Sequence, residues 1–347
     1  MIPSTPRWWY VRRGAPAPLT RALLRPASWF WAWATAERLR AGRPSDPGIP
    51  VICVGNLTVG GAGKTPVVRA LLAQLTAAGV RAHALSRGHG GRLAGPLRVD
   101  PAVHTAADVG DEPLMLAATF PVWIARDRAL GGRAAAAAGA EVVVMDDGHQ
   151  NPSLSKALSL VVVDGETRGT EWPFGDGAVF PAGPMREPLA AGLARADAVV
   201  LLLPAGLDAP DPELMALLST RPVLIARLQP AEPPPAGPQV GFAGVAKPWK
   251  VERALLTAGC DLKDFAPLPD HARLDERLLR SLADRAQLYG AGLVTTEKDW
   301  VRLPPAWRDR VAAWPVAVRF DDVQALEGLI SQAFSRARWR QAESPDG

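Results

Sequence analysis

The sequence predicts an α/β fold with a mainly parallel β-sheet, and three observations support that prediction. Short apolar runs without polar alternation are separated by helical stretches, which is typical of strands covered on both faces. A glycine-rich loop containing a lysine lies between the first of these runs and a helical stretch. Proline is dense over residues 227–239, and because such a segment cannot enter a helix or a central strand, it marks a linker or domain boundary.

Before that boundary, strands and helices alternate along the chain. The expected strands are apolar runs of strand length at residues 51–54, 82–85, 121–125, 141–145, 160–163 and 198–203. Helices are expected at 65–78 and, after the third strand, up to about residue 138, where alanine is a good helix former.

Beyond the boundary, smaller α/β units recur. One strand is expected in "QVGFAGVA", which begins at Gln239, and another in "GLVTTEKD", which begins at Gly292. Helices are expected at 248–258 and 275–289. A strand at 314–320 precedes a last helix that reaches about residue 339.

The positive charge of the chain is concentrated at its N-terminus. Residues 1–48 carry eight arginines and two acidic residues, a net charge of +6, whereas the whole chain has +4, which leaves −2 for the rest. We therefore expect no nucleic-acid partner. The two cysteines, Cys53 and Cys260, form no metal or redox motif, which favours a reduced, cytosolic compartment.

The N-terminal segment is also aromatic. At helical spacing Leu23, Phe30 and Trp33 fall on one face, and Arg21 and Ser28 point away from it. This pattern leaves two interpretations open. The helix lies in the headgroup region of an anionic membrane, or it packs its aromatic side chains on the protein's own core.

Two further features limit what this segment can be. Pro26 is expected to divide it into two short helices. The uncharged run at 26–36 is shorter than the roughly 20 apolar residues that span a bilayer. It also starts late and lacks the cleavage site of a secretory signal.

The loop "VGNLTVGGAGKTP", residues 54–66, is close to a phosphate-binding loop, although Thr58 stands where the strict pattern G-x-x-x-x-G-K-[ST] has glycine. Backbone N–H groups and the helix N-terminus would bind phosphate. Lys64 would reach the β- and γ-phosphates, and the Thr65 hydroxyl would bind Mg²⁺. The alternative is a glycine-rich turn with an incidental lysine. The predicted nucleotide contacts of the loop are Gly60, Gly61, Ala62, Gly63, Lys64 and Thr65.

An acidic pair follows a later strand. In "EVVVMDDGHQ", residues 141–150, an apolar run brings Asp146 and Asp147 to its carboxyl end, the edge at which ligands bind in open α/β sheets. One of them can hold Mg²⁺ directly or through water. A DDG turn is the alternative. Together the loop and the acidic pair predict ATP and Mg²⁺ as cofactors.

Motifs distinguish among classes of nucleotide-binding protein. A GTPase carries N-K-x-D, and the nearest string, "TTEKD" at 295–299, does not match it. Dimeric ATPases that insert metals or partition DNA begin the loop with a lysine, where this chain has Val59. A kinase or an ATP-dependent ligase remains.

Seven strings occur in the order found in the tetraacyldisaccharide 4′-kinase family, and the chain resembles that family over nearly its whole length. They are "VGNLTVGGAGKTP" (54–66), "LSRGHGG" (85–91), "VGDEP" (109–113), "DDGHQ" (146–150), "PAGPMREP" (181–188), "PDH" (269–271) and "TTEKD" (295–299).

The resemblance implies transfer of the ATP γ-phosphate to the 4′-hydroxyl of a tetraacylated glucosamine disaccharide 1-phosphate, the lipid A disaccharide precursor. It implies an enzyme bound peripherally at the cytoplasmic face of the inner membrane, and we expect a monomer. The competing hypothesis is a P-loop assembly or switch ATPase whose N-terminal helix binds a partner protein. The missing N-K-x-D motif and the missing loop lysine count against it.

The resemblance also implies a P-loop NTPase-type domain joined by a two-stranded hinge to a smaller α/β domain. The strings "RPVLIAR" (221–227) and "WPVAVRF" (314–320) fit that hinge. The expected division is an N-terminal segment at 1–48, a kinase domain at 49–228, a smaller domain with the hinge strands at 229–320, and a C-terminal helix and tail at 321–347.

Roles at the acceptor side follow from the resemblance. Asp111 of "GDEP" activates the acceptor hydroxyl, Glu112 lies near the metal, and His271 of "PDH" orients or tunes Asp111. From the residues alone, Asp111 also fits a helix N-cap and His271 an exposed loop residue. Lys64 is assigned to catalysis as well as to phosphate binding.

The nucleotide and substrate sides complete the predicted site. Gln150 is placed with Asp146 and Asp147 beside the nucleotide and the metal. The arginines expected to bind the lipid 1-phosphate or the ATP phosphates are Arg87, Arg128 and Arg186, and each also fits a structural salt bridge.

The chain departs from the family pattern at four positions. In the family's D-D-G-x-Q-H string, His149 replaces an apolar residue and Asn151 replaces the final histidine. His89 replaces a tyrosine, and Lys247 is added in "AGVAKP". Because none of these changes affects the loop lysine, the aspartate pair or the "GDEP" acids, we expect an active enzyme.

Overall fold

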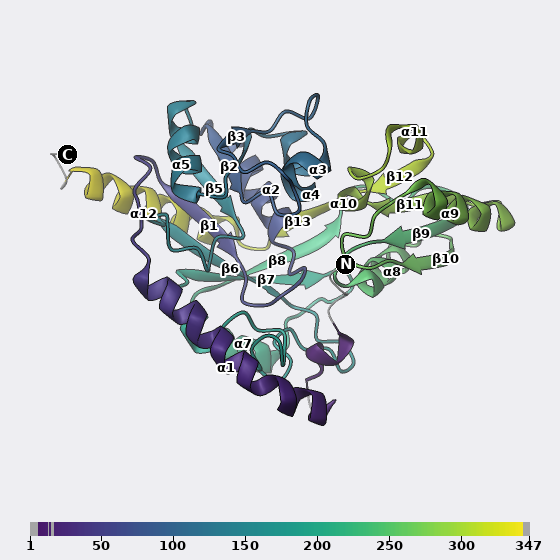
Figure 1. The fold of residues 1–347 in the computed structure, drawn as a ribbon, viewed down its shortest axis with the longest axis horizontal. Coiled ribbons are helices and arrows are strands. Elements are labelled where there is room, and N and C mark those ends of the chain that lie inside the picture. Colours follow the sequence, from purple (N-terminus) through teal and green to yellow (C-terminus); the bar gives the residue numbers. More distant parts are fainter. Residues whose placement is uncertain (1–5, 13, 15–16, 343–347) are drawn as a thin grey trace.

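Two β-sheets lie side by side in the computed structural model, which describes residues 6–12, 14 and 17–342 (Figure 1). Within those residues the larger sheet has the strand order β13-β8-β7-β6-β1-β5-β2-β4-β3, and the smaller has the order β10-β9-β11-β12. The α/β fold class with a second, smaller α/β unit is confirmed. Arg13 of the basic segment and residues 343–347 of the expected tail lie outside the described residues.

The larger sheet is parallel except at its two edges, where β3 and β13 run antiparallel to their neighbours. Each predicted strand of the first part is present, with shifts of one or two residues at its ends. The sheet also contains β3, which was not predicted. Its strands are β1 (Val51–Gly55), β2 (Ala82–Ser86), β3 (Leu97–Arg98), β4 (Val122–Ile124), β5 (Val142–Asp146), β6 (Leu158–Asp164), β7 (Ala198–Pro204), β8 (Val223–Pro230) and β13 (Val316–Phe320).

Helices cover both faces of this sheet, which explains the unbroken apolar runs. In β1, Ile52 and Val54 belong to one core cluster and Val51 and Cys53 to another on the opposite face. The first face is covered by α2 (Lys64–Ala77), α4 (Asp111–Ala117) and α12 (Val323–Ala342), with α3 (Ala106–Val109) beside α4. The other is covered by α5 (Arg128–Ala137), α6 (Leu189–Ala194) and α7 (Pro212–Leu218).

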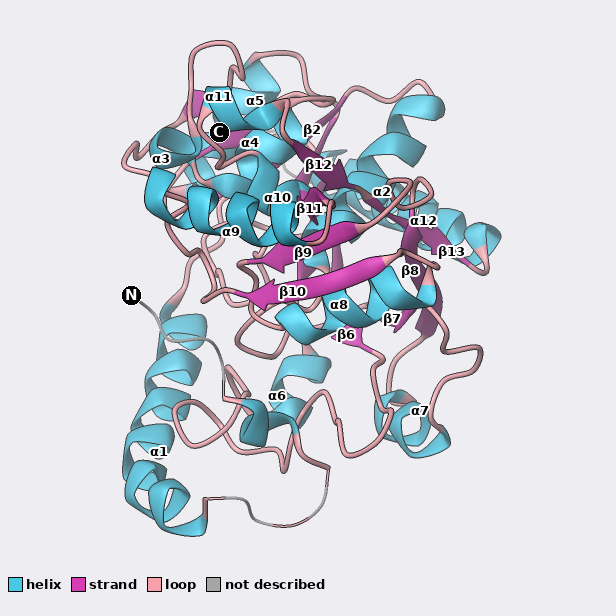
Figure 2. Ribbon diagram, turned by 90° about the vertical axis from the view of Figure 1, so that its right-hand side faces the viewer, coloured by secondary structure: helices cyan, strands magenta, loops and turns pink. Residues whose placement is uncertain are grey.

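All four strands of the smaller sheet are parallel (Figure 2). They are β9 (Gln239–Ala243), β10 (Leu262–Pro267), β11 (Gly292–Thr296) and β12 (Val311–Trp314). The helices α8 (Pro248–Thr257) and α9 (Glu276–Leu288) pack into separate cores on this sheet, and the short α10 (Glu297–Trp300) and α11 (Pro305–Arg308) follow β11.

Two chain segments connect the sheets. The strands β8 and β13 pair antiparallel, so the two strings assigned to the hinge do lie together. The strand expected at 314–320 is in fact two strands in two different sheets, because Pro315 separates β12 from β13 and has no N–H for a ladder. The expected boundary at 228/229 falls inside β8.

The N-terminal helix corrects one prediction. The helix α1 (Pro18–Ala41) continues through Pro26, which we expected to divide it. Pro26 and Ala22 are both exposed, so the carbonyl that loses its partner can bind water. On either side of the proline, Arg21 pairs with Asp176 and the Ser28 hydroxyl accepts a hydrogen bond from the Ala182 N–H.

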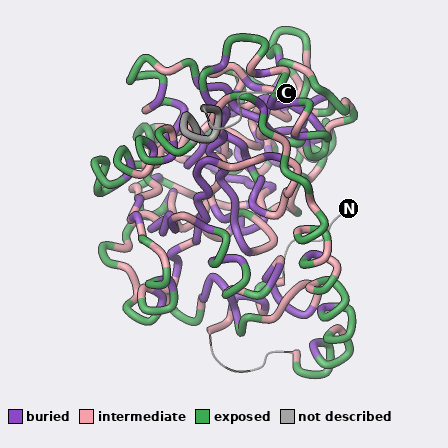
Figure 3. Tube along the Cα trace, turned by 90° about the vertical axis from the view of Figure 1, so that its left-hand side faces the viewer, coloured by how far each residue is buried: buried purple, intermediate pink, exposed green. Residues whose placement is uncertain are grey.

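Most of α1 is exposed, and its outer face carries large apolar side chains together with arginines (Figure 3). Its polar residues Arg21, Ser28 and Thr35 are buried against the body. The exposed large side chains are Leu19, Leu23, Trp29, Phe30, Trp31 and Trp33. The interpretation that these aromatic side chains pack on the protein's own core is therefore wrong for most of them. In the described ranges, no helix has the length and apolar character needed to span a bilayer.

Candidate active site

The phosphate-binding loop ends at the first turn of α2. Gly63 is the N-cap residue with φ of 80°, a conformation that favours glycine, and a Cβ there would lie 2.3 Å from the end of the Leu202 side chain. Lys64 is the first residue of the helix, and Thr65 follows it. The backbone N–H groups at this end are those that bind anions in phosphate loops.

The first half of the loop explains the departure at Thr58. Thr58 forms a β-bridge with Met185, and the Val59 N–H donates to the Pro184 carbonyl at 2.7 Å. Arg186 Nε donates to the Thr58 carbonyl at 3.0 Å. Because this position is paired in an extended conformation, a β-branched residue suits it and glycine is not required.

Lys64 lies between two acceptors. Its ammonium donates to Asn56 Oδ1 at 3.2 Å and is 3.6 Å from Asp147 Oδ1. Burial lowers the pKa of Lys64 below its ordinary value, and Asp147 opposes that shift. Asn56 therefore orients the lysine, a role that we did not predict although Asn56 lies in the quoted loop string.

Asp146 ends β5 beside the loop and has the character of a metal ligand. Thr65 Oγ1 donates to Asp146 Oδ2 at 3.1 Å, and Asp146 Oδ1 is buried without a hydrogen-bond partner. Burial raises the pKa of this carboxyl to about 6. A hydroxyl and a carboxylate oxygen of this kind fit Mg²⁺. The part of the chain that the structure describes holds no group of three acidic, histidine or cysteine side chains that would bind a metal.

Asp147 points to a different partner. Its φ of 52° is left-handed, and Arg186 binds both of its oxygens, at 2.6 and 3.1 Å. Although burial raises the pKa of Asp147, Lys64 and Arg186 outweigh it and hold the pKa well below its usual range. Asp147 thus stays ionised between two cations. We call Lys64, Thr65, Asp146, Asp147 and Arg186 the loop group.

Gln150 links the loop group to Asn56 and Glu187 through hydrogen bonds. Its amide nitrogen donates to the Asn56 carbonyl and to Glu187 Oε1, both at 2.9 Å, and its oxygen accepts from Arg186 at 3.3 Å. Glu187 is buried and also pairs with Arg195. Glu187 was missed by the sequence reasoning, although it lies in the quoted "PAGPMREP" string.

The second set of predicted residues surrounds the start of α4. Gly110 has φ of 93° and is the N-cap residue, so Asp111 is not the cap. Asp111 Oδ2 instead lies 2.9 Å from Nδ1 of His271, 160 positions later in the chain. This hydrogen bond raises the pKa of His271 above its ordinary value. The structure therefore brings together the two residues that the family resemblance paired.

Two cations from the smaller sheet's side complete this set. Lys298 is 2.8 Å from Glu112 Oε1 and 3.3 Å from His271 Nε2. Arg302 Nε lies 3.4 Å from Asp111 Oδ2. We call Asp111, Glu112, His271, Lys298 and Arg302 the inter-sheet group. Lys298 and Arg302 were not predicted, and only the "TTEKD" string could have pointed to Lys298.

The remaining predicted arginines are placed differently. Arg87 is exposed, whereas Arg128 is buried and donates to the Ala125 carbonyl with its Nε left unpaired. Burial lowers the pKa of Arg128 to about 10, and the nearby Arg87 adds to that shift. Neither arginine has a carboxylate partner among the interactions found for the described residues, in contrast to Arg186.

The departures from the family pattern have structural explanations. His149 is buried, and its ring nitrogens lie 3.1 Å from Ser159 Oγ and 2.9 Å from the Gly192 carbonyl. Burial lowers the pKa of His149 to about 4, so it is a neutral core residue at physiological pH. The Asn151 side chain accepts from Ser153 in a turn.

The other two departures lie nearer the site. The His89 ring centre is 6.0 Å from that of His271. Lys247 is buried and binds Asp164, the last residue of β6, at 2.9 Å. The neighbouring Ala246 lies against Gly61 of the phosphate loop, where an added Cβ would be 3.9 Å from the Ala246 Cβ.

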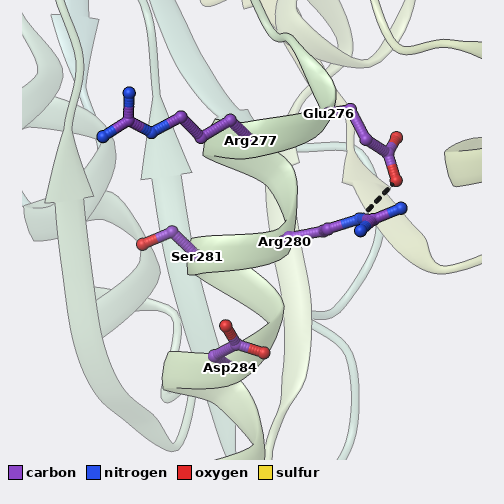
Figure 4. A pocket seen from close by; sticks show the side chains of 5 residues that line it. All are labelled: Glu276, Arg277, Arg280, Ser281 and Asp284. Atoms are coloured by element: carbon purple, nitrogen blue, oxygen red, sulfur yellow. Dashed lines mark hydrogen bonds and ion pairs between the residues drawn. The ribbon is translucent and has the colours of Figure 1, made fainter.

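A shallow depression on α9 lies away from these residues (Figure 4). It is lined by Glu276, Arg277, Arg280, Ser281 and Asp284. The side chains fan out from one helix, and Glu276 pairs with Arg280 at 2.8 Å. None of them belongs to the loop group or the inter-sheet group.

Comparison with known proteins identifies the family. The family model described as tetraacyldisaccharide-1-P 4′-kinase matches residues 20–335. A tetraacyldisaccharide 4′-kinase of Caulobacter vibrioides (strain NA1000 / CB15N) is 68% identical over 94% of this chain and 98% of its own length. One of Rhodospirillum centenum is 51% identical over 96% and 97%.

A solved structure agrees with these relatives. The crystal structure of LpxK from Aquifex aeolicus in complex with ATP has a TM-score of 0.71 to this chain, at 25% identity, and covers 91% of this chain and 99% of that one. The chain belongs to the tetraacyldisaccharide-1-phosphate 4′-kinase family.

Proposed function

We propose how this kinase divides its reaction between the loop group and the inter-sheet group. The chain is an ATP-dependent kinase of lipid A biosynthesis that phosphorylates the 4′-hydroxyl of the tetraacyl disaccharide 1-phosphate. The competing assembly-ATPase hypothesis is not favoured by these relatives. In our proposal the loop group holds the ATP phosphates and Mg²⁺, and Asp111 accepts the proton of the acceptor hydroxyl.

The contact between Asp111 and His271 carries the proposal. The Asp111 side chain contacts His271 and Arg302 in the described part of the chain. Both contacts are made through its Oδ2 atom. This leaves Oδ1 as the oxygen that would face the acceptor hydroxyl. A carboxylate held in this way can take the proton as the hydroxyl attacks the γ-phosphate.

The loop group would act on the other side of the transferred phosphate. Lys64 would bind the β- and γ-phosphates, and its neighbours Asn56 and Asp147 hold it beside the loop. Thr65 and Asp146 would hold Mg²⁺, which neutralises charge on the phosphates when it is bound. Arg186 would keep Asp147 ionised, and Arg87 and Arg128 would bind substrate anions.

Phosphate transfer to lipid tests this division. With γ-labelled ATP, Mg²⁺ and tetraacyl disaccharide 1-phosphate, we expect Asp111→Asn to lower kcat by roughly 10²–10⁴-fold, while ATP still binds. The matched control is Asp100→Asn, which changes an exposed aspartate that follows β3. This variant should keep the wild-type rate. Full activity of Asp111→Asn would remove Asp111 as the base.

We further propose that α1 holds the enzyme peripherally at the cytoplasmic face of the inner membrane, as a monomer. Its exposed Leu23, Phe30 and Trp33 support this, because such side chains insert at the boundary of headgroups and acyl chains. Exposed arginines on the helix, such as Arg25 and Arg38, favour anionic lipid.

Co-sedimentation with phosphatidylglycerol vesicles tests the membrane proposal. The triple variant Leu23→Ser, Phe30→Ser and Trp33→Ser should leave the pellet and stay folded, because these side chains contribute little to the core. Val103→Ser, which changes an equally exposed apolar residue elsewhere, should pellet like the wild type. Unchanged pelleting of the triple variant would contradict the proposal. Light scattering of the protein without vesicles checks that it is a monomer.

A further inference from the structure

Three consecutive residues of the "TTEKD" string each contact a different part of the active site. We call Glu297, Lys298 and Asp299 the EKD segment. They form the first turn of α10, directly after β11, and α10 packs against α4 of the larger sheet as well as against the smaller sheet (Figure 1). Nothing in the division of roles above uses Glu297 or Asp299.

The start of α10 is fixed by its cap. The Thr296 hydroxyl accepts from the Asp299 N–H at 3.1 Å and donates to Asp299 Oδ2 at 2.6 Å. Because successive residues of a helix point about 100° apart, three neighbouring side chains leave such a turn in three directions. The EKD segment can therefore reach three separate partners from one rigid position.

Glu297 reaches the helix of the phosphate loop. Both of its oxygens accept from Arg69 Nη1, at 3.0 and 2.7 Å. Arg69 lies on α2, whose first residue is Lys64. Glu297 therefore connects the smaller sheet to the helix that positions the loop lysine. Both side chains are about a quarter exposed, which makes the pair accessible to substitution.

Lys298 reaches the helix of the proposed base. It pairs with Glu112 on α4 and lies 3.3 Å from Nε2 of His271. Burial lowers the pKa of Lys298, but Glu112 and Asp270 outweigh it, so the pKa is raised and the ammonium stays charged. An ammonium has only donors, so in neutral His271 the Nε2 atom accepts. His271 then carries its proton on Nδ1 and donates it to Asp111.

Asp299 anchors the segment to its own sheet. It is fully buried, accepts from the Gly244 N–H at 3.1 Å and pairs with Arg302. Arg302 in turn lies 3.4 Å from Asp111. Glu297 thus contacts the helix that begins at Lys64, Lys298 contacts Glu112 and His271, and Asp299 pairs with Arg302, which lies near Asp111.

We propose that the EKD segment is a set of positioning residues that aligns the helix of Lys64 with the helix of Asp111 and fixes the tautomer of His271. Transfer in line requires the attacking oxygen and the phosphate to be held within fractions of an ångström. Since the loop group and the inter-sheet group sit on different helices, a third element that binds both would hold that alignment. The inference rests on Asp111 acting as the base.

A charge exchange tests the first contact. Glu297→Arg and Arg69→Glu should each lower kcat for lipid phosphorylation by about tenfold, the effect of a small misalignment. Binding of a fluorescent ATP analogue should be unchanged. The double variant, which restores an opposite-charge pair, should recover to within about threefold of the wild type.

The control exchanges an ion pair of similar type away from the site. Arg81 and Glu141 lie 3.4 Å apart at the amino ends of β2 and β5, and exchanging them should leave kcat within about twofold. Thermal melting shows whether each variant folds. If the folded single variants at Glu297 and Arg69 keep wild-type kcat, or if the double variant is no better than either, the proposal fails.

A second set of variants tests the tautomer. Lys298→Met should lower kcat and shift its pH profile, because His271 Nε2 loses its donor, while Lys298→Arg keeps a donor and should restore most of the rate. An unshifted profile in Lys298→Met would overturn this part. If Asp111→Asn is inactive but the EKD variants are normal, only the present inference fails. If Asp111→Asn is active, the base assignment fails first.

Discussion

The loop group and the inter-sheet group of the active site differ in where their residues come from. The loop group lies at the carboxyl ends of strands of one sheet and on the loops that follow them, and its members contact one another directly. The inter-sheet group takes Asp111 and Glu112 from α4 of the larger sheet and His271, Lys298 and Arg302 from the smaller one. The first group is therefore built with its sheet, whereas the second exists only when the two sheets are correctly placed.

Because of this difference, the two groups should respond differently to substitution. A change inside the loop group should damage phosphate and metal binding and leave the placement of the sheets alone. A change inside the inter-sheet group should act on the reaction rate with smaller effects on nucleotide binding.

Lys64→Ala should give the largest loss. Removing the ammonium that contacts the transferred phosphate should lower kcat by roughly 10³-fold or more, and the measurement is single-turnover transfer from labelled ATP to lipid. Lys156→Ala, which removes another partly buried lysine that binds the carbonyls of Gly148 and His149, is the control and should keep most of the activity. A nearly normal rate in Lys64→Ala would contradict the assignment of the loop.

Gly110→Ala should weaken the inter-sheet group through the backbone. Its φ of 93° disfavours any side chain, and the new Cβ would lie 2.4 Å from the His89 carbonyl. We expect a loss of stability of about 1–2 kcal/mol and a lower kcat with ATP affinity preserved. Gly139→Ala also has a positive φ, of 88°, but meets nothing within 4 Å, so it should lose stability without losing kcat in the folded protein. Equal kcat in the two folded variants would contradict the prediction.

Mg²⁺ binding should depend on pH through Asp146. Its folded pKa of about 6 exceeds its ordinary value of 3.8, so the fold favours the protonated form. In metal-free protein this group adds stability below its unfolded pKa, and the contribution is lost as pH rises through about 6. Mg²⁺ requires the carboxylate, so the rise in Tm caused by Mg²⁺ should be full above about pH 7 and should fade as pH falls through 6. Asp146→Asn should abolish the rise, and a rise independent of pH would refute the assignment.

His271→Gln should give the smallest effect on stability. The Asp111 hydrogen bond raises the pKa of His271, so its contribution is fully present below the ordinary value of 6.5 and is lost as pH rises past the folded pKa. The stability gap to the wild type, about 1 kcal/mol or less for a partly exposed pair, should shrink from mildly acidic to alkaline pH.

His83→Gln provides the opposite sign for comparison. Burial lowers the pKa of His83, so protonation of this residue destabilises the folded wild type at low pH. The difference in stability between the wild type and His83→Gln should therefore grow as pH rises toward 6.5. Denaturant titrations of both variants at several pH values measure the two trends. Parallel trends in the two variants would show that the His271–Asp111 contact does not contribute in solution.

The sequence predicted the part of the site that is local. Apolar runs without alternation gave the strands, and the string around Lys64 placed the loop between β1 and α2, because both depend on neighbouring residues. The pairing of Asp111 with His271 spans 160 positions, and that of Arg69 with Glu297 spans 228. No periodicity records such contacts, so the first came only from family resemblance and the second was not predicted.

Two fold errors involve a proline. Pro26 was expected to break α1, but tertiary contacts on both sides of the proline keep the helix continuous. Residues 314–320 read as one apolar strand, yet Pro315 lets the chain leave one sheet and enter another. The local rule failed at Pro26, where packing keeps the helix whole, whereas Pro315 does end one strand before the next begins.

The β-bridge between Thr58 and Met185 has a consequence for how such loops are recognised. A search that demands glycine at the first position of the phosphate-binding pattern would pass over this protein, although the catalytic end of the loop is complete. The position pairs with a neighbouring segment of the chain. A better signature for loops of this kind would score the "PMR" string more than a hundred residues downstream together with the glycines, since the two segments form one structural unit.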